Sequence, residues 1–296
     1  MLWIPLVLLY GLLKGGREIA KKKAMTKNTV MEVLFVYTLM SFIFVIPQAG
    51  QAGGMEKKIF FLIALKSFVM FLAWIFGFYS LKKMPVSLYG VLSLSRVLFA
   101  TFSGVIFLHE TLAGNQIAGL VIVCAGLLLL RVPARKKEAV EEVQLEQNTE
   151  ALPAADPVKP VYIIAAFVSC ILNAVSGFMD KVLMRDVTSS QLQFWYMLFL
   201  VIYYAIYVLV TREKIGRSVF KNGWVWALAI MFVIGDKALF IANGMSESRI
   251  TIMTLIKQSA CLVTIIGGRI FFKEDRILYR LLCAAIILGG IALSLF

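Results

Sequence analysis

Charged residues are scarce in this sequence of 296 residues. Asp, Glu, Lys and Arg make up 16% of it, whereas a soluble globular domain contains about 25%. Hydrophobic residues account for 60%, and the mean hydropathy is +0.86. This balance excludes an ordinary soluble domain, because the polar side chains are too few to cover its surface. The composition therefore predicts an integral membrane protein with the lipid bilayer as its solvent.

The sequence also lacks the patterns of an enzyme or a metal site. It contains one histidine, His109, and no HExxH, GxSxG or GxxxxGK[ST] motif. Its four cysteines lie in apolar runs without a CxxC pair, which predicts buried thiols rather than disulfides or ligands. We therefore expect no enzymatic activity, no cofactor and no metal. The formal charge of +13 does not indicate nucleic acid binding, because Lys and Arg in a membrane protein mainly set its orientation.

Apolar stretches recur along the whole chain. A spanning helix needs about 20 mostly apolar residues, and this length predicts an all-α polytopic membrane protein with ten transmembrane helices. The predicted helices lie at residues 2–20, 29–47, 59–81, 85–108, 114–131, 160–183, 190–211, 222–243, 250–272 and 277–296.

Two parts of the chain follow the same pattern. Residues 85–126 and 249–290 each contain a helix rich in small residues, an acidic turn and a second helix that ends in glycine. Aligning Glu110 with Glu274 brings the two stretches into register without a gap. An internal repeat in a membrane chain is typical of transporters built from two related halves.

The predicted organisation is two halves joined by a linker. Residues 1–131 and 160–296 each hold five predicted helices, and 132–159 is a charged, solvated linker. An odd number of spans inverts the second half relative to the first. Loops on one face carry 18 Lys and Arg, and those on the other face, with both termini, carry four. This bias predicts a cytoplasmic linker and both termini outside.

These features resemble the EamA-like branch of the drug/metabolite transporter superfamily. The resemblance lies in the two five-helix halves, their acidic turns FLHETL (107–112) and FFKEDR (271–276), and final helices that close on Ala-Gly or Gly-Gly. It implies ten helices, a central cavity between the halves, lined mainly by the third, fourth, eighth and ninth helices, and alternating access. Many members carry basic residues near both termini and keep them inside, so this implication opposes the charge count.

A charge at membrane depth is costly and by default faces a cavity or a partner. Arg96 lies near the middle of the fourth predicted helix, with Tyr89 and Ser93 on the same face. The ninth predicted helix carries Lys257 at a similar depth, with Gln258 beside it. Packing does not account for a buried Arg96 or Lys257, so we predict that these residues contact substrate.

The eighth predicted helix, 222–243, carries Asp236 and Lys237 near its middle. Two interpretations of Asp236 stay open. It neutralises Arg96 or Lys257 in a fixed ion pair, or it is the site of a coupling proton or cation.

Other charges lie near the ends of predicted helices, where long side chains reach the membrane interface. These residues are Lys14, Arg17, Glu18, Asp180, Lys181 and Arg269. Lys66 in the third predicted helix is a weaker candidate for the cavity.

The sequence therefore predicts a secondary transporter of a small polar metabolite, an amino acid or organic anion, bound near the bilayer midplane between the repeats. A lipid-linked sugar flippase subunit and a non-transporting membrane scaffold or sensor are the alternatives. The expected partners are the small-molecule substrate and the lipid bilayer, with a coupling proton or cation left open and no nucleic acid. The chain is expected as a monomer or homodimer, multi-pass in a cell membrane such as the bacterial inner membrane.

Overall fold

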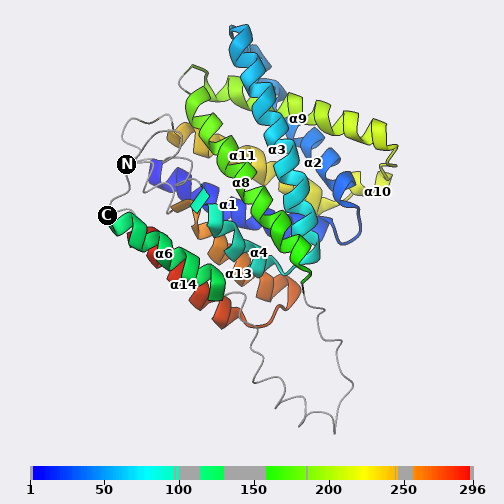
Figure 1. Ribbon diagram of the computed structural model, residues 1–296. Helices are drawn as coiled ribbons and strands as arrows, with labels where there is room; N and C mark the ends of the chain where they lie inside the picture. Colours follow the sequence, from blue (N-terminus) through cyan, green and yellow to red (C-terminus); the bar gives the residue numbers. More distant parts are fainter. Residues whose placement is uncertain are drawn as a thin grey trace.

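The computed structural model describes residues 3–96, 98–99, 114–129, 158–184, 186–243, 245 and 256–293. Within these ranges every regular element is helical and no strand occurs, which confirms the predicted all-α class (Figure 1). The elements are α1 (Trp3–Ala24), α2 (Val30–Val45), η1 (Ile46–Gln51), α3 (Lys57–Lys83), α4 (Val86–Leu92), η2 (Ser93–Ser95), α6 (Gly114–Leu129), α8 (Pro160–Leu183), α9 (Ser189–Thr211), α10 (Arg217–Phe220), α11 (Gly223–Asn243), α13 (Ser259–Phe272) and α14 (Ile277–Leu293).

Five helices in the described ranges are long and apolar enough to cross a membrane, which supports a multi-pass membrane protein. They are Val30–Gln51, Lys57–Lys83, Pro160–Asp180, Ser189–Thr211 and Gly223–Ala242. The shorter apolar helices are Val86–Ser95, Ile117–Gly126, Ser259–Phe272 and Ile277–Leu293. The total of ten spans stays a prediction, because residues 100–108 and 250–255 of two predicted spans lie outside the described residues. Most of the predicted linker, 132–159, also lies outside them.

The helix α1 differs from these five because charges interrupt its apolar stretch. It holds Lys14, Arg17 and Glu18, and it continues to Ala24, whereas the sequence pattern predicts an end at residue 20. The longer helix places Arg17 and Glu18 well inside α1. It packs along α11 and α13, so these charges lie inside the bundle rather than at its rim.

Two helices begin at capping boxes close to their predicted starts. Before α2, the Thr29 hydroxyl accepts a hydrogen bond from the Glu32 amide at 3.2 Å, and the Glu32 carboxylate accepts from the Thr29 amide at 2.8 Å. Thr188 and Gln191 form the same reciprocal pair at the start of α9. Such a box satisfies backbone donors that the first turn of a helix leaves unpaired.

The helix α4 begins without a cap of its own, and a distant carboxylate replaces one. Glu274, in the turn between α13 and α14, accepts hydrogen bonds from the backbone amides of Val86 at 2.6 Å and Ser87 at 3.1 Å. Arg280 donates to the same carboxylate at 2.8 Å, and the Lys22 ammonium lies 3.8 Å from it. Anions are stabilised at a helix N-terminus, so Glu274 joins α4 to the far end of the chain.

Helices from the first part of the chain pack mainly on helices from the second part. The long contacts pair α1 with α11 and α3 with α8. Further contacts pair α2 with α9, α4 with α13, and α6 with α14, which lie side by side at one edge of the bundle (Figure 1). The main apolar core lies between these pairs and includes Tyr37, Phe78, Met197 and Tyr204, each at most 1% exposed.

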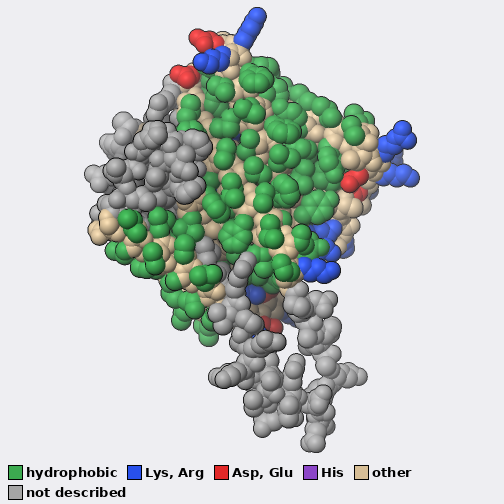
Figure 2. All heavy atoms as spheres, in the orientation of Figure 1, with side chains coloured by type: hydrophobic (Ala, Val, Ile, Leu, Met, Phe, Trp, Pro, Cys, Tyr) green, Lys and Arg blue, Asp and Glu red, His purple; other side chains and the backbone are tan. Residues whose placement is uncertain are grey.

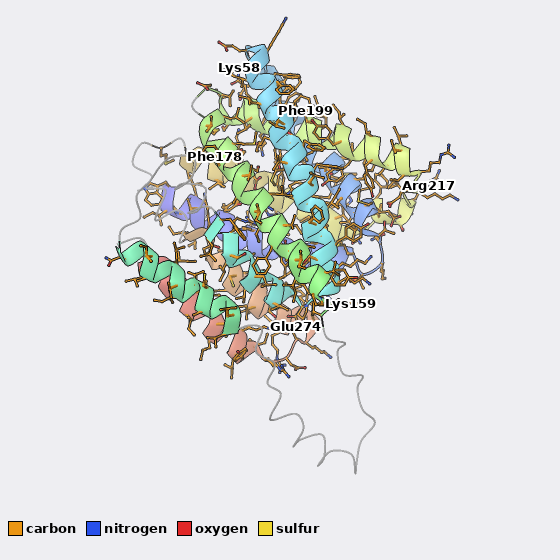
Figure 3. The ribbon with its side chains drawn as sticks, viewed as in Figure 1. Lys58, Lys159, Phe178, Phe199, Arg217 and Glu274 are labelled. Carbon is orange, nitrogen blue, oxygen red and sulfur yellow. The ribbon has the colours of Figure 1, made fainter. Side chains whose placement is uncertain are left out.

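The outer surface is apolar over a wide area. Figure 2 shows hydrophobic side chains covering the visible face, with Lys and Arg gathered near its edges. Several large apolar side chains are exposed, including Phe61 at 68% and Leu209 and Val210 at 76% each. Lys58 and Lys159 lie toward opposite ends of the bundle (Figure 3). An apolar band between charged ends is the surface that a bilayer requires.

Gly90 lets α4 approach α13 closely. A Cβ atom at this position would collide with the Thr264 hydroxyl and lie 2.8 Å from the Thr264 Cβ. We expect Gly90→Ala to lower the free energy of unfolding by about 1–3 kcal/mol, the usual cost of overpacking. The matched control is Gly177→Ala in α8, where a Cβ would meet no heavy atom within 4 Å. That change should stabilise the chain slightly. Equal thermal unfolding midpoints in detergent would contradict the close approach.

Candidate functional site

A cavity of about 90 Å³ lies inside the bundle. Its walls come from α1, α2, α3 and α4 in the first part of the chain and from α8, α9 and α11 in the second. The volume has room for several water molecules or a small metabolite. The wall residues are Tyr10, Lys14, Arg17, Glu18, Lys21, Tyr37, Met70, Ala73, Trp74, Gly77, Phe78, Tyr89, Arg96, Ser169, Asn173, Tyr196, Phe232 and Asp236.

Cations outnumber carboxylates on the cavity wall. Three of the four cations stand on one face of α1 at Lys14, Arg17 and Lys21, and the fourth is Arg96, directly after η2. The two carboxylates are those of Glu18 and Asp236. Because charges inside a bundle are screened much less than in water, this excess favours an anionic group in the cavity.

Arg17 and Asp236 form an ion pair across two helices. The Arg17 Nη1 donates to Asp236 Oδ1 at 3.0 Å, and the two side chains are 8% and 17% exposed. The guanidinium also lies over the rings of Phe232 and Tyr10, at 5.1 and 5.5 Å from their centroids. Asp236 thus has Arg17 as its partner, and this pair joins α1 to α11.

Glu18 is only partly paired. Its Oε1 accepts a hydrogen bond from the Lys21 ammonium at 2.8 Å. Its Oε2 is buried and has no hydrogen-bond partner in the described part of the chain, and the same holds for Arg96 Nε. Neither Arg96 nor Lys14 forms an ion pair with a described carboxylate. Among the described residues, the wall therefore presents two cations without a carboxylate partner and one carboxylate with a single oxygen engaged.

Aromatic rings form the opposite wall of the cavity. Tyr37 from α2 packs against Trp74 of α3 at 5.2 Å and against Phe232 of α11 at 5.6 Å between ring centroids. Trp74 in turn lies 5.4 Å from Phe232 and 6.4 Å from Tyr196 of α9. These rings fix one side of the cavity and bring four phenol hydroxyls near it, counting Tyr10 and Tyr89.

Sequence comparison identifies the first part of the chain. Residues 1–132 match the profile of the EamA-like transporter family. This family is part of the drug/metabolite transporter superfamily, so the match over these residues agrees with the family that the sequence predicts. Together with the apolar helices, it supports a multi-pass membrane protein.

Structural comparison finds a similar fold over nearly the whole chain. A solved structure described as "Crystal structure of protein" superposes with a TM-score of 0.64 at 15% sequence identity. The match covers 97% of this chain and 94% of the other chain. At this identity the likeness concerns the fold alone. A comparison with curated proteins gave no match.

Three of the residues predicted from the sequence of the EamA-like chain line the cavity, namely Arg96, Tyr89 and Asp236. Lys257 and Gln258 lie just before α13 and are not on the cavity wall, and Gln258 is buried. That Lys257 contacts substrate together with Arg96 stays a prediction.

Ser93 and Lys237 also lie away from the cavity wall. The Ser93 hydroxyl donates to the Gly90 carbonyl at 2.6 Å, a bond within its own helical turn. The Lys237 ammonium donates to Gln48 Oε1 and Ser190 Oγ, each at 2.9 Å, between α11, η1 and α9. Lys237 thus bridges three elements through neutral acceptors.

The cations of α1 were not predicted as cavity residues. The expectation that Arg17 reaches the membrane interface is wrong, because its side chain is buried inside the bundle. A usable signal was present, since Tyr10, Lys14, Arg17 and Lys21 recur at spacings of four, three and four and share one helical face.

Lys66 of α3 is the other buried cation. It is 2% exposed, lies 2.7 Å from Asp180 of α8, and stands 3.7 Å from the centre of the Tyr196 ring. Asp180 was expected at the membrane interface, and the structure instead places it beside Lys66 across the α3–α8 contact.

Proposed function

We propose that the EamA-like chain is a secondary transporter of a small polar metabolite, an amino acid or an organic anion. The substrate binds in the cavity beside Arg96. The observation that carries this proposal is the cavity itself, which lies between both parts of the chain and whose wall holds four cations and two carboxylates. A cation excess in a poorly solvated site selects a ligand with a carboxylate or phosphate group.

The proposal includes alternating access between two inverted repeats, residues 1–131 and 160–296. The helix packing supports this arrangement, because the two halves exchange equivalent contacts. The first helix of one predicted half, α1, packs along the third helix of the other, α11, and α3 packs along α8 in the reverse sense. Two halves related by an approximate two-fold axis in the membrane plane make such exchanged contacts, and the substrate then binds at their interface.

For Asp236 we favour a fixed ion pair over a coupling site, with Arg17 as the partner in place of the predicted Arg96 or Lys257. Its carboxylate already faces Arg17 at 3.0 Å, so we propose that it holds α1 against α11 rather than acting as the coupling site. The identity of any coupling ion stays open in this proposal.

Uptake by purified protein in proteoliposomes tests the function. We expect at least one member of a panel of amino acids and organic acids to be taken up, and to raise the thermal unfolding midpoint as a ligand of the folded state does. Arg96→Lys keeps the charge and loses the planar fork of donors, so uptake should fall about tenfold or more with the unfolding midpoint retained. Lys58→Gln at the exposed start of α3 is the control. If no compound is taken up or shifts the midpoint, the transporter proposal is wrong.

A further inference from the structure

We propose that the ligand of this cavity is an acidic α-amino acid. One carboxylate binds Arg96, the second binds Lys14, and the ammonium binds the free oxygen of Glu18. The inference rests on the proposed function and narrows its substrate class from amino acids and organic anions in general to a zwitterion with one extra negative charge.

The first observation is the pair of unsatisfied polar atoms. Buried polar groups almost always have a hydrogen-bond partner, and exceptions require an explanation. In the described part of the chain, Arg96 Nε is a buried donor without a partner, and Glu18 Oε2 is a buried acceptor without one. Both residues line the same cavity. A ligand that carries an acceptor and a donor, as the carboxylate and ammonium of an amino acid do, satisfies both atoms.

The second observation is the charge that remains after the internal pairs are formed. Arg17 is paired with Asp236, and Lys21 with one oxygen of Glu18. Lys14 and Arg96 have no carboxylate partner among the described residues. A neutral amino acid leaves one of these cations unmatched, and a simple dicarboxylate leaves Glu18 Oε2 unmatched. An acidic amino acid supplies a carboxylate to each of the two cations and an ammonium to Glu18 Oε2.

The placement on α1 suits a small ligand of this kind. Lys14 and Glu18 are one helical turn apart and therefore neighbours on the same face. The cavity volume is about 90 Å³, which suits a small ligand. Tyr37, Tyr89 and Tyr196 also line the cavity, and phenols donate hydrogen bonds to carboxylates.

Three matched compounds test the inference on the wild-type chain, namely L-aspartate, L-asparagine and succinate. Asparagine replaces the second carboxylate by an amide, and succinate lacks the ammonium. We expect L-aspartate to bind about 10- to 100-fold more tightly than either, because each missing group removes a charge-assisted hydrogen bond. Binding is measured by calorimetry on purified protein, and uptake in proteoliposomes.

Two variants test which side chain binds which group of the ligand. Glu18→Gln should abolish the preference for L-aspartate over succinate, and Lys14→Gln should abolish the preference for L-aspartate over L-asparagine. Asp186→Asn and Lys58→Gln, both exposed, are the controls and should keep both preferences. Unfolding midpoints are measured for each variant, and the wild-type series decides the question if a variant does not fold.

The outcomes separate this inference from the transporter proposal. Equal binding of succinate and L-aspartate by the wild-type chain, or binding of other amino acids or organic acids without L-aspartate, overturns the acidic amino acid and leaves a transporter. Failure of every compound to bind or to be taken up overturns both.

Discussion

Replacing Arg17 by Gln is expected to lower the free energy of unfolding by about 3–5 kcal/mol, because it leaves the Asp236 carboxylate buried without its partner. The two side chains meet at 3.0 Å and are 8% and 17% exposed. The guanidinium also lies over the Phe232 ring at 5.1 Å, and that contact is lost with it. The effect is large because neither charge can reach bulk water without separating α1 from α11.

A double-mutant cycle separates the pair from its surroundings. Asp236→Asn alone should destabilise the chain by a similar amount, because it leaves Arg17 unpaired. The double change removes both charges and should recover at least half of the loss, since no uncompensated charge remains. Free energies come from denaturant unfolding in detergent.

A surface pair provides the matched control for this cycle. Arg269 and Asp275 lie 3.5 Å apart with side chains 63% and 91% exposed. Arg269→Gln should change stability by less than about 1 kcal/mol. If Arg17→Gln is as mild as Arg269→Gln, the pair between α1 and α11 does not hold the helices together.

The sequence was enough to predict the helical membrane fold and the family, because both depend on local patterns. Runs of about 20 apolar residues set the spans, and the acidic turns FLHETL and FFKEDR marked the family. Thr29 and Thr188 fixed two helix starts through capping boxes. These signals lie within a few residues of the structure that they determine.

The site was only partly predictable because it depends on which distant helices meet. Arg96 was singled out from its depth in its own helix. Arg17 was not, because the predicted end of the first helix at residue 20 placed it near the rim, whereas α1 continues to Ala24. The partner of Asp236 could not be chosen from the sequence, since the α1–α11 contact joins residues 219 positions apart.

The acidic turns illustrate the same limit. Glu274 lies in the second acidic turn, and the structure shows it capping α4, 188 positions earlier. Its repeat equivalent, Glu110, lies outside the described residues.

Replacing Glu274 by Ala is expected to lower the free energy of unfolding by about 3–5 kcal/mol, a loss of the same order as that expected for Arg17→Gln. The side chain is 8% exposed and accepts hydrogen bonds from the Val86 and Ser87 amides. Its removal leaves these donors without a partner and also leaves the partly buried cations Arg280 and Lys22 without this carboxylate. Loss of a helix cap alone costs about 0.5–2 kcal/mol, so the unpaired charges account for the larger part.

The adjacent residue makes a close control for this prediction. Asp275 carries the same charge in the same turn, and its side chain is 91% exposed. Asp275→Ala should leave the unfolding midpoint nearly unchanged, whereas Glu274→Gln, which retains one acceptor oxygen but no charge, should lie between Glu274→Ala and the wild type. If Glu274→Ala unfolds at the wild-type midpoint, Glu274 does not hold α4 against the α13–α14 turn in the resting protein.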